Sequence, residues 1–290
     1  MEKVLLIGLG SAGWQIDEQS TIKGKSHTYS ILQSDSFRIC AGVEINSEVA
    51  SLWEKTFCVK AFMDIESALK DSTYDIIVIS TPIPTLFNVL KKCLAIAPFS
   101  KIIVEKPVIS SSSHYPELVD ISEKEGHRIL VNLPRLLAPE SNEIKEKIGD
   151  WNLLSLNGTY SGSYTNTILH VITLVRYWFP LIQVFPILRE NCIDLKFVLN
   201  GVNLGVMHQL RTVVSSTFDI HIMSEDSELS YKDGGLNITF TYRGKISEIF
   251  NSRDVYQGNV YNFIQDYGFS TAVQICGIRQ ILPGIAQMLP

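Results

Sequence analysis

The stretch Val4–Gly13, which reads VLLIGLGSAG, decides the fold class. Its four apolar residues, Val4–Ile7, predict a strand buried on both faces, and they run directly into a G-x-G-x-x-G spacing. In such a turn the first glycine allows the tight bend, the second lets the backbone approach a pyrophosphate, and the third lets a helix pack on the strand. An ordinary glycine-rich turn is the alternative, but the preceding buried strand favours dinucleotide binding. The predicted contacts are Gly8, Gly10, Ser11, Ala12 and Gly13.

The first 130 residues alternate short apolar runs with helical patterns. The predicted strands are Val4–Ile7, Arg38–Val43, Asp75–Ser80, Lys101–Glu105 and Arg128–Asn132. The predicted helices are Ser47–Phe57, Ile65–Lys70, Pro84–Ile96 and His114–Glu125. Ser47 and Gly126 are expected to cap a helix start and a helix end. This alternation predicts right-handed βαβ units, and therefore an α/β fold with a doubly wound parallel sheet.

The pattern changes after residue 130, where strands follow one another. The predicted strands are Leu153–Tyr160, Lys196–Asn200, Val206–Val214, Phe218–Met223 and Leu236–Tyr242. Asp233–Gly235 is a hairpin signal, and the predicted helices are Ile168–Tyr177 and about Thr271 to Met288. We therefore expect a dinucleotide-binding domain over residues 1–130 and a C-terminal α+β domain with a mostly antiparallel sheet over 131–290, with a cleft between them.

Composition excludes several classes of protein. The 290 residues carry a net charge of −5, which disfavours binding to nucleic acid or to an anionic membrane. The five cysteines match no zinc site or disulfide framework, so we expect no metal and a reduced, cytoplasmic protein. The chain opens straight into a strand, which predicts no signal peptide. The apolar segment Ile168–Leu188 is interrupted by His170, Arg176 and two prolines, so we expect no membrane span.

Two further segments are predicted at the cofactor edge of the sheet. Glu44 ends the second strand, where a carboxylate can hold the adenosine ribose, although it lies 31 residues after Gly13 and the usual spacing is about 20. The stretch Ile16–Lys25 has the character of an insertion that accounts for the excess. A carboxylate at this position repels a 2′-phosphate, which favours NAD with NADP as the alternative. The predicted contacts after the next strand are Ser80, Thr81 and Pro82, and a plain strand-terminating turn is their alternative interpretation.

Two side chains are candidates for proton transfer. Lys106 follows the buried strand and precedes Pro107, so it can point into the cleft with a pKa lowered by desolvation. A lysine paired with a strand-end carboxylate is the alternative, and Glu105 and Lys106 are also predicted cofactor contacts. His170 lies on an apolar helix, with Asn166 four residues earlier on the same face. An amide and an imidazole placed in this way can grip a hydroxyl and move its proton, whereas a satisfied core histidine is the simpler interpretation.

Together these motifs resemble the Gfo/Idh/MocA family of nicotinamide-dependent oxidoreductases. The matching elements are the glycine turn, Thr81-Pro82, Glu105-Lys106-Pro107, Val131-Asn132-x-x-Arg135 and Asn166-x-x-x-His170. The resemblance implies a Rossmann domain and an open-faced α/β domain that usually forms the oligomer interface, so we expect a homo-oligomer, a dimer or a tetramer. It also implies Lys106 as the proton-transfer residue, His170 as its acid or base partner, and a sugar, polyol or derivative as the small-molecule substrate.

The leading hypothesis is therefore an NAD(P)-dependent dehydrogenase acting on CH–OH groups, with Arg135 and Asn166 positioning the substrate. Tyr160 lines the sugar pocket in this hypothesis, or else packs in the core. One alternative is a reductase of imines or double bonds on the same fold. Another is a non-catalytic NAD-binding protein, because Thr173 replaces an acid found in many members and fold alone does not establish function.

Overall fold

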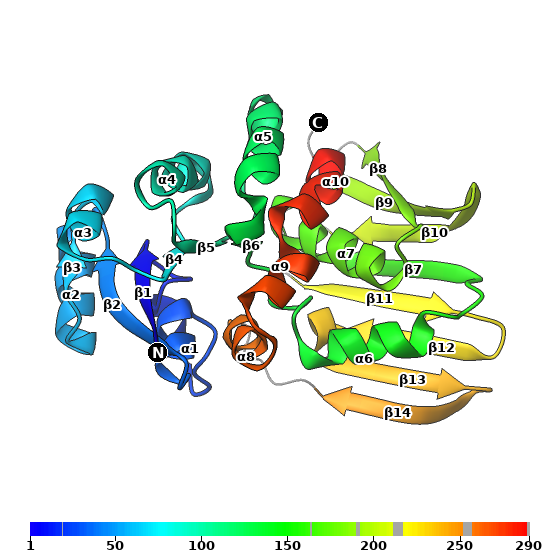
Figure 1. Ribbon diagram of the computed structural model, residues 1–290. Helices are drawn as coiled ribbons and strands as arrows, with labels where there is room; N and C mark the ends of the chain where they lie inside the picture. Colours follow the sequence, from blue (N-terminus) through cyan, green and yellow to red (C-terminus); the bar gives the residue numbers. More distant parts are fainter. Residues whose placement is uncertain (19, 163, 190–191, 211–216, 252–256, 289–290) are drawn as a thin grey trace. The chain divides into compact units, whose positions relative to one another are not determined.

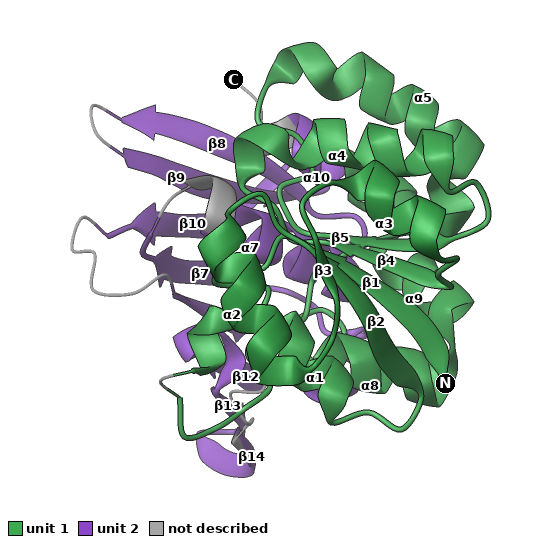
Figure 2. Ribbon diagram, turned by 90° about the vertical axis from the view of Figure 1, so that its left-hand side faces the viewer, with its two compact units in different colours: residues 1–137, 254–282 green, residues 138–253, 283–290 purple. Residues whose placement is uncertain are grey.

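The computed structural model describes residues 1–18, 20–162, 164–189, 192–210, 217–251 and 257–288, and it divides the chain into two compact units (Figure 2). Unit 1 comprises Met1–Leu137 and Asp254–Leu282, and unit 2 comprises Ala138–Arg253 and Pro283–Pro290. The sequence placed one boundary after residue 130, whereas unit 1 also takes the later segment. The reason is that this segment forms helices that pack on unit 1, and Leu130 makes a β-bridge with Gly277.

Unit 1 is built on a six-stranded sheet in the order β3-β2-β1-β4-β5-β6 (Figure 1). All neighbouring strands are parallel, which confirms the predicted doubly wound sheet. Continuous burial explains the strands, because every residue of β4 is fully buried. The bounds are β1 (Glu2–Ile7), β2 (Phe37–Val43), β3 (Ala61–Phe62), β4 (Ile76–Ile79), β5 (Lys101–Val104) and β6 (Ile129–Val131). The two-residue strand β3 is too short for periodicity to reveal.

Four helices of unit 1 begin and end within one residue of the predicted bounds: α2 (Ser47–Phe57), α3 (Ile65–Asp71), α4 (Ile83–Ile96) and α5 (Tyr115–Glu125). The sequence did not predict α1 (His27–Leu32) or α8 (Gly258–Tyr267), and α9 (Phe269–Cys276) lies at the start of the predicted last helix. Short 3-10 turns lie at Gln15–Asp17, Ser112–His114 and Gly126–Arg128. The start cap predicted at Ser47 is wrong by one residue. Asn46 caps α2, because its side chain accepts hydrogen bonds from the amides of Glu48 and Val49. Gly126 is the C-cap of α5, as predicted.

Unit 2 contains an eight-stranded sheet in the order β14-β13-β12-β11-β7-β10-β9-β8. Only the β7–β10 pair is parallel among its described neighbours, which confirms the mostly antiparallel sheet. The bounds are β7 (Ser155–Tyr160), β8 (Gln183–Arg189), β9 (Cys192–Leu199), β10 (Val202–Gln209), β11 (Phe218–Met223), β12 (Ser227–Lys232), β13 (Asn237–Tyr242) and β14 (Lys245–Asn251). The predicted strand Val206–Val214 extends beyond the described residues. The 3-10 turn Asp233–Gly235 joins β12 to β13, as the hairpin signal predicted.

One face of this sheet packs against helices, as Figure 1 shows for α6 (Pro139–Ile148) and α7 (Tyr164–Trp178). Alternate residues of β11 are buried, which is the pattern of a sheet with one covered face. The Trp178 indole on α7 donates to the Ser141 carbonyl on α6 at 3.2 Å. The long last helix expected from the sequence is divided at Gly277 into α9 and α10 (Ile278–Met288), because Gly277 has an extended backbone.

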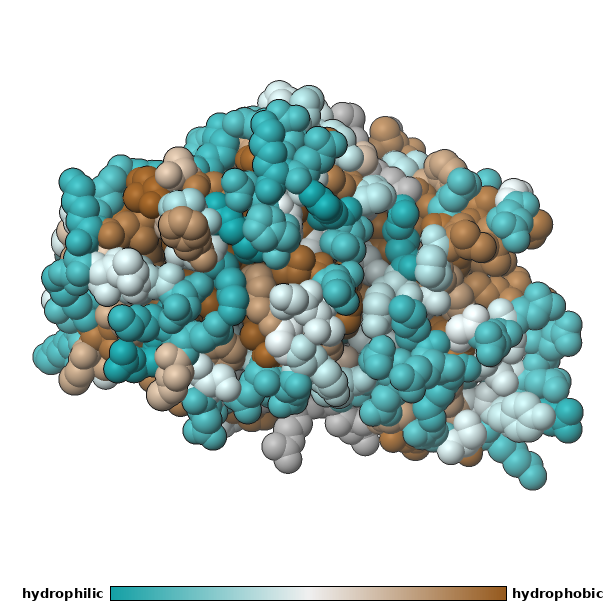
Figure 3. Space-filling model, in the orientation of Figure 1, coloured by the Kyte–Doolittle hydropathy of each residue, from teal (hydrophilic) through white to brown (hydrophobic). Residues whose placement is uncertain are grey.

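The surface seen in Figure 3 carries hydrophilic residues over α5 and α6 and mixed residues elsewhere. Within the described ranges, no helix combines the length and apolar character that crossing a membrane requires.

Candidate cofactor and catalytic site

The three glycines of the first turn have three different environments. Gly8 has φ of +92°, and an added Cβ would lie 2.8 Å from backbone atoms of Ser80 and Thr81. A Cβ on Gly13 would lie 2.5 Å from the Gly8 carbonyl oxygen, so this residue allows close packing within the turn. A Cβ on Gly10 would meet nothing within 4 Å. Gly8 and Gly13 are therefore required by the protein's own packing, whereas Gly10 leaves open space beside the turn, as close approach by a pyrophosphate demands.

The glycine turn lies where the sheet order reverses, between β1 and β4, which is where ligands bind in open α/β sheets. The Ser80 hydroxyl donates to the carbonyls of Gly8 at 2.7 Å and of Ile7 at 3.3 Å, and so fixes the two strand ends together. The neighbouring Thr81 hydroxyl is buried and has no hydrogen-bond partner among the described residues. A buried hydroxyl without a partner is costly, and a bound ligand can satisfy it. Pro82 is the N-cap of α4.

Glu44 is held beside the glycine turn by two backbone amides. Its Oε2 accepts from the Leu9 amide at 2.9 Å, and its Oε1 accepts from the Asn46 amide at 3.0 Å. Each oxygen retains a second lone pair, which a ribose hydroxyl can use. The position therefore fits the ribose-binding carboxylate that the sequence predicts.

The first crossover helix is interrupted by an insertion, as the sequence predicted for Ile16–Lys25. The amides of His27 and Thr28 donate to the carbonyls of Ala12 and Gly13 at 3.0 and 2.9 Å. In an unbroken helix the donor to Gly13 would stand four residues later, but Thr28 stands fifteen later. Eleven residues are therefore inserted, and their removal would place Glu44 about 20 residues after Gly13, the usual spacing.

A buried aspartate closes this insertion. Asp17 is fully buried, and its carboxylate accepts from the amides of Gly24, Lys25 and Ser26 at 3.3, 3.2 and 2.8 Å. The Ser26 hydroxyl also donates to it at 2.6 Å. These bonds satisfy the amides of the three residues that precede α1, and they fix where α1 resumes, at His27.

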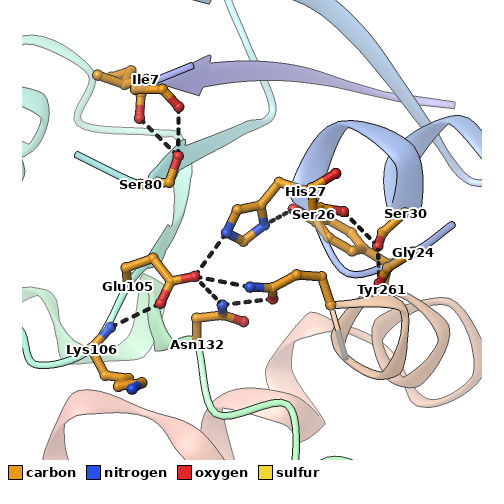
Figure 4. A network of polar contacts seen from close by, with 12 residues as sticks. Ile7, Gly24, Ser26, His27, Ser30, Ser80, Glu105, Lys106, Asn132 and Tyr261 are labelled. Carbon is orange, nitrogen blue, oxygen red and sulfur yellow. Dashed lines mark hydrogen bonds and ion pairs between the residues drawn. The ribbon is translucent and has the colours of Figure 1, made fainter. Parts of the chain in front are cut away.

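His27 belongs to a buried polar network around Glu105 (Figure 4). Its Nε2 lies 3.1 Å from Oε1 of Glu105, and its Nδ1 lies 2.8 Å from the hydroxyl of Tyr261 on α8. The same Oε1 accepts from the side-chain amides of Asn132 at 2.6 Å and Gln257 at 3.0 Å. Asn132 also donates to Gln257 at 2.7 Å. His27, near the N-terminus, and Gln257, near the C-terminus, thus both contact Glu105, the residue that precedes Lys106.

The charges around Glu105 and Lys106 are strongly coupled. Burial of the Glu105 carboxyl raises its pKa, but the hydrogen bond and charge of His27, the charge of Lys106 and the Asn132 amide together hold this pKa below its ordinary value. Burial lowers the pKa of Lys106, and the Arg135 guanidinium lowers it further, against the opposing effect of Glu105. Lys106 is thus an amine poised to release its proton more readily than an exposed lysine.

The remaining predicted residues lie in unit 2. His170 is buried on α7 with 4% of its surface exposed, and the Thr173 hydroxyl donates to the Leu169 and His170 carbonyls at 2.6 and 3.1 Å. Asn166 also belongs to α7, and its side chain lies outside the described residues. Tyr160 is buried at the end of β7, with its hydroxyl donating to the Ile193 carbonyl. The substrate role predicted for these residues stays a prediction.

Sequence reasoning missed His27, Gln257 and Tyr261. His27 lies more than 200 positions from the other two, and no spacing motif links it to them. The only available signal for His27 was the insertion: once it is discounted, His27 stands at the third position after Gly13. Asn132 was part of a quoted motif, but nothing in the sequence pointed to its bond with Glu105.

The described residues fit a nicotinamide dinucleotide. The open space at Gly10, the Thr81 hydroxyl and the Glu44 carboxylate would meet its pyrophosphate and ribose parts. Within the same residues, no group of three or more His, Cys, Asp or Glu side chains could hold a metal ion.

Comparison with known proteins agrees with this geometry. Residues 3–133 match the model of an oxidoreductase family with an NAD-binding Rossmann fold, Gfo/Idh/MocA. Comparison with curated protein sequences gave no match.

Solved structures share the fold over nearly the whole chain. UDP-N-acetylglucosamine 3-dehydrogenase from Acidithiobacillus ferrooxidans has a TM-score of 0.74 at 13% identity, over 99% of this chain and 95% of that one. An oxidoreductase from Agrobacterium radiobacter, in complex with NAD+, L-tartaric acid and magnesium, has a TM-score of 0.73 at 12% identity, over 99% and 94%. The super-repressor mutant of Gal80p from Saccharomyces cerevisiae has a TM-score of 0.71 at 20% identity, over 93% and 85%.

At such low identities these structures show the fold alone. The cofactor class follows from the family match over residues 3–133, together with the glycine turn at the reversal of strand order. Over residues 3–133, the chain is thus similar to the Gfo/Idh/MocA oxidoreductase family with its NAD-binding Rossmann fold.

Proposed function

We propose that the protein is an NAD(P)-dependent dehydrogenase that acts on a hydroxyl-bearing carbon of a sugar, polyol or sugar derivative. NAD, when bound, exchanges a hydride with that carbon. Lys106 and His170 handle the hydroxyl proton, and Arg135 and Asn166 position the substrate. The observation that carries the proposal is the environment of Lys106, at the carboxyl end of β5 on the cofactor edge of the sheet, where burial and Arg135 lower its pKa.

Lys106 suits proton transfer because burial and Arg135 favour its neutral amine, while the negative charge of Glu105 favours its protonated form. A general acid or base works best when its pKa lies near the working pH. Burial and Arg135 shift the pKa of Lys106 in that direction, and Glu105 limits the shift. The amine can therefore accept a proton from a substrate hydroxyl during oxidation and return it during reduction.

The substrate class rests on the family and on one neighbour. The neighbour from Acidithiobacillus ferrooxidans acts on UDP-N-acetylglucosamine, which places sugar nucleotides among the compounds to test. We propose NAD as the preferred cofactor because Glu44 places a carboxylate beside the glycine turn, where a 2′-phosphate would be repelled. A homo-oligomer in solution belongs to the same proposal.

The test is turnover by Lys106→Met on a panel of sugars, polyols and nucleotide sugars. Methionine keeps much of the side-chain volume and removes the titrating amine. We expect turnover to fall by roughly 100- to 10,000-fold while NAD binding, measured by titration, remains. Unchanged turnover would remove Lys106 from the mechanism.

A double-mutant cycle tests the pairing with His170. If Lys106 and His170 handle the same proton, His170→Ala combined with Lys106→Met should cost little more than either change alone. Fully additive losses would mean that the two residues act in separate steps.

The second candidate is a non-catalytic NAD-binding protein. Two observations favour it. The Thr173 hydroxyl, at a position where many family members carry an acid, donates its hydrogen bonds to backbone carbonyls of α7. The fold also occurs in the super-repressor mutant of Gal80p. Tight NAD binding without turnover on the same panel would support this function. Reduction of imine substrates in preference to alcohols would instead support a reductase.

A further inference from the structure

The Glu105 carboxylate is held as an acceptor by three N–H groups on one oxygen. Oε1 receives His27 Nε2, Asn132 Nδ2 and Gln257 Nε2 at 3.1, 2.6 and 3.0 Å. Hydrogen bonds donated to a carboxylate stabilise its ionised form.

The position of His27 is itself fixed from two sides. The Tyr261 hydroxyl lies 2.8 Å from Nδ1, and the two rings meet edge to face with centroids 5.9 Å apart. Asp17 fixes the start of α1, as described above, and the His27 amide is bonded to the Ala12 carbonyl. The imidazole therefore has one orientation, with Nε2 directed at Glu105.

Glu105 in turn lies directly against Lys106. Its second oxygen, Oε2, accepts from the Lys106 amide at 3.3 Å. Among the described residues, the titratable or charged groups that act on this pair include His27 on α1, Tyr261 on α8 and Arg135 after β6. Burial raises the pKa of Tyr261 well above its ordinary value, so its hydroxyl stays neutral. Glu105 is thus the negative charge that offsets Arg135 and burial at Lys106.

We infer that His27 is a positioning residue: it holds Glu105 as an anion beside Lys106 and so keeps the Lys106 amine able to carry a proton. This inference rests on the proposed role of Lys106 in proton transfer. Without an N–H group from position 27, the buried Glu105 carboxyl takes up a proton more readily, and Lys106 then loses its countercharge. A larger fraction of the amine would then be neutral, and the residue would be a poorer proton donor.

The test measures the protonation of Lys106 directly. The full-length protein, without cofactor or substrate, is treated with limiting acetic anhydride over a range of pH, and acetylation of Lys106 is quantified by peptide mass spectrometry. The exposed Lys3 of the same unit serves as the internal reference. For His27→Leu we expect Lys106 labelling at neutral pH to rise by a factor on the order of 10 relative to Lys3, because one pKa unit changes the free-amine fraction tenfold.

Two matched variants separate positioning from general damage. The glutamine amide in His27→Gln can reach where Nε2 lies and donate to Glu105, whereas the shorter asparagine amide in His27→Asn reaches only where Nδ1 lies. We expect His27→Gln to titrate as the wild type and His27→Asn as His27→Leu. Identical Lys106 titration in the wild type and all three variants would overturn the inference, as would equal shifts in all three.

The labelling requires no NAD and no turnover, so it separates this inference from the proposed function. A shifted titration together with inactivity on the whole substrate panel would refute the dehydrogenase and keep the positioning role. If the protein is an active dehydrogenase and its Lys106 titration does not depend on position 27, the proposed function is kept and the positioning role of His27 is refuted. In an active enzyme, the pH profile of kcat should move to lower pH in His27→Leu and stay in place in His27→Gln.

Discussion

Gly10→Ala and Gly13→Ala should have opposite effects, although both add one methyl group to the same turn. A methyl on Gly13 would lie 2.5 Å from the Gly8 carbonyl oxygen and 2.9 Å from Leu9 Cα, both rigid backbone atoms. Overpacking of this kind costs about 1–3 kcal/mol, and we expect the upper end because no side chain can move aside. A methyl on Gly10 meets no protein atom within 4 Å and should change the free energy of unfolding by less than about 0.5 kcal/mol.

The ligand effect should be reversed. The Gly10 methyl would occupy space that the pyrophosphate needs, so we expect the Kd for NAD to rise by roughly tenfold or more, which is about 1.4 kcal/mol. Thermal unfolding with and without NAD measures both quantities, because saturating ligand stabilises the protein by an amount set by its Kd. A wild-type NAD affinity in Gly10→Ala would refute the role of Gly10 in pyrophosphate binding. A wild-type free energy of unfolding in Gly13→Ala would refute the packing role of Gly13.

Three further predictions address other parts of the molecule. Glu44→Gln should weaken NAD binding and reduce the ratio of the Kd for NADP to the Kd for NAD, because the carboxylate no longer repels a 2′-phosphate. An unchanged ratio in parallel titrations would exclude Glu44 from the ribose site. Burial raises the pKa of Asp194, but the Gln209 amide, His208 and Arg189 outweigh burial and lower this pKa overall. The ionised Asp194 therefore stabilises the fold above its unfolded-state pKa, and this contribution is lost as the pH falls through its folded-state pKa. Urea unfolding should therefore depend less on pH in the acid range for Asp194→Asn, and parallel pH curves would contradict this. Burial raises the pKa of Cys93 to about 12 and that of Cys276 well above its ordinary value, so native alkylation at pH 8 should modify the exposed Cys58 first, and early labelling of Cys93 would show that its region opens.

The fold of unit 1 was readable from the sequence because each of its signals is local. A strand buried on both faces is a continuous apolar run, and the strand–helix alternation restricts the connections to right-handed crossovers. The glycine turn was readable because its three glycines stand at a fixed short spacing directly after a buried strand. In unit 2, β8, β12 and β14 escaped prediction because edge and half-exposed strands carry weaker patterns.

The sequence by itself determined the doubly wound sheet, the glycine turn at its centre and the presence of a lysine at the end of β5. Only the tertiary structure decided what surrounds that lysine. His27, Asn132, Gln257 and Tyr261 come together around Glu105 because α1 resumes after an eleven-residue insertion and α8 returns to unit 1 late in the chain. Hydrogen bonds between residues 27 to 234 positions apart leave no periodicity in the sequence, and so the electrostatic environment of Lys106 is a property of the folded molecule alone.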